Sequence, residues 1–64
     1  MIFAPKLFPD DLQRVTDAFT GELERGQERR IALNYATAVY LQRHPFVAVG
    51  EARAMIRGAL EKKQ

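Results

Sequence analysis

Hydrophobic side chains recur at helical spacing in three stretches of this chain. In residues 10–25 they return every three or four positions and fall within about 80° of a helical wheel. Residues 27–43 and 49–62 repeat that periodicity, and no stretch alternates apolar and polar positions as a half-buried strand does. The pattern predicts an all-α fold, a single domain of three helices within residues 1–64. The first apolar arc consists of Leu12, Val15, Phe19 and Leu23.

The predicted helix limits follow from capping residues and helix breakers. Asp10 is a preferred N-cap, and Gln13 lies three residues later, where it can complete a capping box. Gly26 is expected to end the first helix, because a helix that continued through it would present two divergent apolar faces. A continuous helix is the alternative, since the residue after Gly26 is a weak N-cap. Pro45 ends the second helix, because proline disfavours helical geometry at the preceding residue.

Residues 1–9 are predicted to form an extended arm, because Pro5 and Pro9 each push the preceding residue toward extended geometry. The arm is apolar, so we expect some of its large side chains to be pinned on the helices. Those side chains are Phe3, Leu7 and Phe8. The segment lacks the charged start, long apolar core and cleavage site of a secretory signal. No apolar run is long enough to span a membrane, and we expect no membrane partner.

The second predicted helix, residues 27–43, is apolar on almost every side. A helix that is hydrophobic all round is buried all round, and two short helices offer little surface to cover it. We therefore expect homodimerisation to complete the fold, with Leu33, Tyr40 and Leu41 at the contact between the copies. Of the two tyrosines, one is expected in the core and one at an interface. The expected core anchors are Phe19, Ile31 and Ile56.

Length and composition support the same expectation of a partner. A chain of 64 residues buries only about 60% of the surface that its unfolded form exposes, so such domains commonly need disulfides, metals or oligomerisation. The chain has no cysteine, which excludes disulfides, and one histidine without thiolates nearly excludes structural zinc. Helix packing or a second chain remains. The lack of cysteine is also compatible with a reducing cytosol, and we expect a soluble, cytoplasmic protein.

Charge is distributed unevenly along the chain. Residues 1–28 carry three basic and six acidic side chains, whereas residues 29–64 carry seven basic and two acidic ones. Either an acidic first helix packs beside basic later ones, or the basic half forms a surface for nucleic acid. The second explanation would place DNA or RNA against the basic side chains of that half. These are Arg29, Arg30, Arg53, Arg57, Lys62 and Lys63.

No constellation of residues forces a reaction, a metal or a cofactor. The chain has neither cysteine nor serine. Its one histidine, His44, lies at the predicted end of the second helix, where an imidazolium can interact with the last carbonyls. We therefore expect no enzyme and no catalytic, cofactor-binding or metal-ligating residues. The predicted function is a small helical protein–protein interaction module that self-associates, and the alternative is a small DNA- or RNA-binding regulator.

Overall fold

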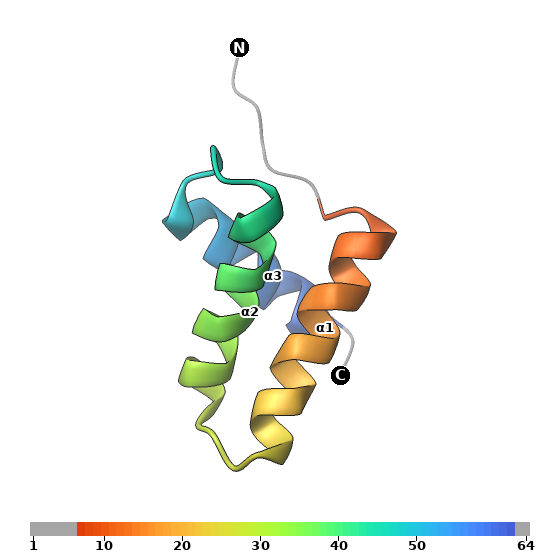
Figure 1. The fold of residues 1–64 in the computed structure, drawn as a ribbon, viewed down its shortest axis with the longest axis vertical. Coiled ribbons are helices and arrows are strands. Elements are labelled where there is room, and N and C mark those ends of the chain that lie inside the picture. Colours follow the sequence, from red (N-terminus) through yellow and green to blue (C-terminus); the bar gives the residue numbers. More distant parts are fainter. Residues whose placement is uncertain (1–6, 63–64) are drawn as a thin grey trace.

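The computed structural model describes residues 7–62 and contains three α-helices in that range, with no strand. They are α1 (Pro9–Glu24), α2 (Arg29–Arg43) and α3 (Val49–Lys62). Helices α1 and α2 lie side by side and run in opposite directions, and α3 crosses behind them (Figure 1). The all-α, three-helix prediction is therefore confirmed. Within the described range, no helix is both long and apolar enough to cross a bilayer.

Helix α1 begins one residue earlier than predicted, at Pro9. Phe8 is the N-cap and makes no side-chain cap hydrogen bond. The fixed φ of proline suits the first helical position, so Asp10 lies inside the first turn and the N-cap prediction was wrong. Gln13 does not complete a capping box with Asp10. Its Nε2 instead donates to Asp17 Oδ1 one turn onward, at 2.9 Å.

The predicted break at Gly26 is confirmed. Gly26 has a φ of +89°, a left-handed conformation that glycine adopts without strain. Its N–H donates to the Leu23 carbonyl at 3.0 Å, and the Gln27 N–H donates to the Glu22 carbonyl at 3.0 Å. These two bonds form a Schellman motif, which satisfies carbonyls left over at the end of α1. Helix α2 then starts at Arg29, two residues later than predicted.

The end of α2 lies where Pro45 predicted it. His44 is the C-cap, and its N–H donates to the Tyr40 carbonyl at 3.1 Å. A short turn follows, in which the Val47 N–H donates to the His44 carbonyl at 3.2 Å. Helix α3 occupies the predicted residues 49–62. The backbone contact of His44 matches the predicted helix end, but its side chain lies elsewhere, as described below.

The core forms where one face of each helix meets the other two. Phe19 and Ile56 are buried there, as predicted. Ile31 is not, because its side chain is 40% exposed. Helix α2 turns the face around Ala36 inward, and Ile31 lies about 140° from Ala36 on the wheel. Among residues 7–62, the buried apolar residues are Val15, Phe19, Ala32, Leu33, Ala36, Tyr40, Ala52, Ile56 and Leu60.

The three residues expected at a dimer contact are instead wholly or partly buried within a single chain. Leu33 and Tyr40 are buried, and Leu41 packs against the core with part of its surface exposed. Helix α2 contacts both α1 and α3, so one chain covers the face that the sequence left without an obvious partner. Tyr40, expected at an interface, is instead the tyrosine in the core, and Tyr35 is 47% exposed.

The predicted arm is only partly within the described residues. Leu7 packs against the core, as expected for at least one of its large apolar side chains. Phe8 is largely exposed, and Pro9 belongs to α1 rather than to the arm. Phe3 and Pro5 lie outside the described residues.

Candidate functional site

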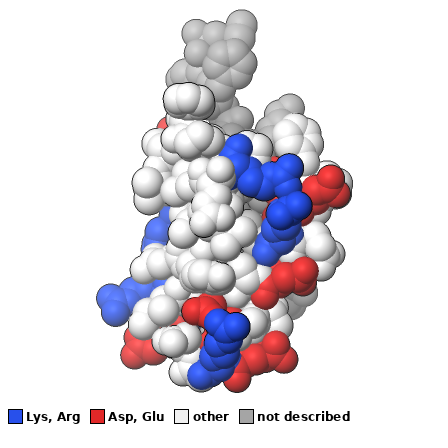
Figure 2. Space-filling model, viewed as in Figure 1, with Lys and Arg blue, Asp and Glu red and all other residues white. Residues whose placement is uncertain are grey.

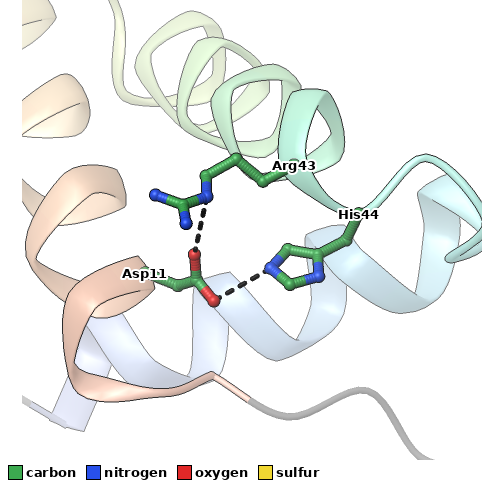
Figure 3. Close-up of polar contacts among 3 residues, drawn as sticks. All are labelled: Asp11, Arg43 and His44. Atoms are coloured by element: carbon green, nitrogen blue, oxygen red, sulfur yellow. Dashed lines mark hydrogen bonds and ion pairs between the residues drawn. The ribbon is translucent and has the colours of Figure 1, made fainter.

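Asp11 is a charged side chain buried in the first turn of α1. Two side chains from the end of α2 reach it (Figure 3). The Nε2 atom of His44 lies 2.9 Å from Asp11 Oδ2, and the Nε atom of Arg43 lies 3.9 Å from Asp11 Oδ1. A carboxylate only accepts hydrogen bonds, so Nε2 of His44 carries the proton of this contact. The carboxylate therefore joins the start of α1 to the end of α2.

Tyr40 completes this group, which we call the junction cluster (Asp11, Tyr40, Arg43 and His44). Its ring stacks on the His44 imidazole, with centroids 4.5 Å apart and planes inclined by 24°. Burial raises the pKa of the Tyr40 hydroxyl above its ordinary value of 10.0, and the negative charge of Asp11 raises it further. The phenol thus stays neutral at physiological pH.

The junction cluster has the contacts of a tether between helices. Here the Asp11 carboxylate holds both Arg43 and His44, and Tyr40 covers one face of the imidazole. Among residues 7–62, no three His, Cys, Asp or Glu side chains gather as metal ligands.

Sequence reasoning missed the junction cluster. It placed His44 only at the end of its own helix and singled out no partner for it on the first helix. Asp11 and His44 are 33 positions apart, so no local pattern links them. A signal that could have found the pair is the coincidence of a charge in the first turn of α1 with a histidine in the last turn of an antiparallel neighbour.

A second candidate site is the solvent-facing side of α2. Four residues on this side follow one another at intervals of four, three and four, which is the spacing of a coiled-coil seam. They are Ile31, Tyr35, Ala38 and Gln42. Ile31 and Tyr35 are 40% and 47% exposed, and Ala38 and Gln42 are exposed as well. We call these four residues the outer face of α2. Figure 2 shows uncharged surface running down the middle of the molecule, with charged side chains toward its margins.

The structure gives the basic side chains that the sequence grouped together different partners. The guanidinium of Arg29 lies over the Phe19 ring of α1, 5.3 Å from its centroid. Arg30 is 4.0 Å from Glu28, and Arg53 donates from Nε to Asn34 Oδ1 at 3.0 Å. Arg57 and Lys62 are exposed on α3, and Lys63 lies outside the described residues.

No protein-family model matches this chain, and the searches of curated proteins and of solved structures found no significantly similar protein.

Proposed function

We propose that this chain is a small non-enzymatic helical protein–protein interaction module that self-associates through the outer face of α2. The observation that carries the proposal is the absence of charge from the middle of that helix. Residues 31–42 contain no Asp, Glu, Lys or Arg, although 28% of the chain is charged. A helix that faces water on one side ordinarily carries charged side chains there. The arginines of α2 instead stand at its ends.

The spacing of the outer face suits a second copy of the same helix. If two α2 helices pair in antiparallel fashion, Tyr35 of one copy meets Ala38 of the other. Ile31 then meets Gln42. A large side chain opposite a small one allows close packing, and a two-fold axis repeats each contact twice. The face is thus complementary to itself without any charge pair. Its exposed surface of Ile31 and Tyr35 would be removed from water by that contact.

Light scattering coupled to size exclusion, over a wide concentration series, tests the proposal. The expected result is a dimer at roughly micromolar concentration. Tyr35→Glu should shift the chain to monomer, because it places two carboxylates beside the two-fold axis in an otherwise apolar contact. Thr20→Glu is the matched control, since it adds the same charge at an exposed position of α1. A monomer throughout the series, or equal effects of the two substitutions, would contradict self-association through α2.

We expect the module to act in the cytoplasm. Because the chain has no cysteine, its stability does not depend on disulfides that the reducing conditions there would break. Fractionation of cells that carry the full chain with a small tag tests this compartment. Recovery with membranes or in the secreted fraction would contradict it.

A further inference from the structure

The exposed contact between Arg53 and Asn34 joins two short rows of polar side chains on neighbouring helices, and three of the four are arginines. Arg30 lies one helical turn before Asn34 on α2, and Arg57 lies one turn after Arg53 on α3. We call Arg30, Asn34, Arg53 and Arg57 the basic seam. We propose that the basic seam binds the phosphate backbone of a nucleic-acid duplex. The proposal concerns a surface beside the outer face of α2 and does not rest on self-association.

Helix geometry places the members of the seam together. Side chains four residues apart share one face of a helix and are separated by about 6 Å along its axis. On α2, Arg30 and Asn34 lie on the edge next to the buried residue Thr37. The hydrogen bond of 3.0 Å from Arg53 fixes the α3 row against that edge, and Arg57 extends it by one turn. Three guanidinium groups thus border the line where α2 and α3 meet.

The charge of Arg30 does little for the fold. Helix α2 has no acidic residue in its first turn, and Arg30 instead lies there. A cation at the start of a helix opposes the macrodipole and destabilises it by a few tenths of a kilocalorie per mole or more. The ion pair of Arg30 with Glu28, at 4.0 Å, joins two exposed side chains and stabilises little. Local arrangements that disfavour the fold commonly mark functional surfaces.

The chemistry of the seam favours nucleic acid over other anions. All three cations are arginines, whose planar forks match phosphate oxygens better than the ammonium of lysine does. Asn34 adds an amide that can donate to phosphate or sugar. The seam contains no aromatic ring on which unpaired bases could stack, so a duplex fits it better than a single strand. Contacts to the backbone alone imply binding without sequence preference.

The test measures binding of the full chain to a short mixed-sequence DNA duplex by fluorescence anisotropy across a salt series. With about three phosphate contacts, the slope of log affinity against log salt should lie near −2.7. The Arg53→Gln/Arg57→Gln variant should lose about tenfold in affinity or more, and its slope should flatten by about two. Arg57→Gln alone keeps the contact between Arg53 and Asn34 and should flatten the slope by about one.

The matched control is Arg14→Gln/Arg25→Gln, which removes the same charge from exposed positions of α1. It should leave the slope nearly unchanged. Equal losses in the two double variants would show that net charge, and not the seam, governs binding. Tighter binding to the single strand, or stronger competition by poly-glutamate than by duplex, would assign the surface to another anion and overturn the proposal. An absence of salt-dependent duplex binding would overturn it as well.

A gain of affinity provides a test that misfolding cannot imitate. Glu61 lies one turn after Arg57 on the same side of α3 and would repel a phosphate backbone that follows the seam. Glu61→Gln should therefore tighten duplex binding several-fold at low salt, with a smaller effect at high salt. Glu24→Gln, on α1, removes the same charge away from the seam and is the control. Equal tightening by both variants would contradict the proposed path of the backbone.

Discussion

Replacing Asp11 by alanine measures how strongly the junction cluster holds α1 against α2. The carboxylate is buried, and it accepts a hydrogen bond of 2.9 Å from His44. A hydrogen bond to a charged group contributes about 1.5–3 kcal/mol. The lower end applies here, because the His44 side chain is 33% exposed and water can replace part of the contact. The macrodipole of α1 adds about 0.3–1 kcal/mol. We therefore expect Asp11→Ala to destabilise the fold by about 2 kcal/mol.

For a domain of this size, that loss corresponds to a fall in Tm of about 8–16 °C. Thermal melts followed by circular dichroism measure it directly. Asp10→Ala is the control, since it removes a neighbouring carboxylate from the same turn at an exposed position. Only the macrodipole effect is lost there, so the expected change is about 0.3–1 kcal/mol.

A double-mutant cycle with His44→Ala separates the contact from the other effects of each substitution. Residues in direct contact show coupling energies of about 0.5–3 kcal/mol, whereas independent sites add within about 0.5 kcal/mol. We expect coupling of about 1–2 kcal/mol between Asp11 and His44. If the two single changes simply add, or if Asp10→Ala destabilises as much as Asp11→Ala, the tether is not a stabilising contact.

Two further predictions concern the core and the buried phenol. Ile56→Ala should lower the free energy of unfolding, measured by chemical denaturation, by about 2–5 kcal/mol, because the side chain is fully buried. Ile31→Ala should lower it by much less, because Ile31 is partly exposed. Similar losses of stability in the two variants would place Ile31 in the core. In Tyr35→Phe, tyrosinate absorbance reports Tyr40 alone. The midpoint of its titration should lie above pH 10.0, because burial raises this pKa, and the shift should vanish in denaturant. Since the unfolded phenol loses its proton first, stability should fall as pH rises from 10.0 toward the folded-state pKa. Titration of Tyr40 at the same pH in folded and denatured protein would contradict its burial.

The sequence by itself determined the helices and where they end. Helical periodicity arises from contacts three and four residues apart, so it can be recognised without the rest of the fold. The left-handed turn at Gly26 and the helix end before Pro45 depend equally on local backbone sterics. Local rules failed at the start of α1, where proline at the first helical position took precedence over the N-cap preference of Asp10, and they placed the start of α2 two residues too early.

Only the tertiary structure decided how α2 is turned. Because this helix is apolar on almost every side, its sequence does not indicate which face is buried. Packing against α1 and α3 covers Leu33 and Tyr40 and leaves Ile31 and Tyr35 exposed. That choice moves the candidate interaction surface to the opposite side of the same helix.

The polar contacts between helices were equally beyond the sequence. His44 meets Asp11 across 33 positions, and Arg53 meets Asn34 across 19. Such contacts depend on the crossing of whole helices, which follows from the fit of all their side chains together. Helical periodicity describes each helix separately and carries no information about how the helices are placed relative to one another. The sequence therefore predicts which polar residues each helix carries, and packing decides which of them come into contact.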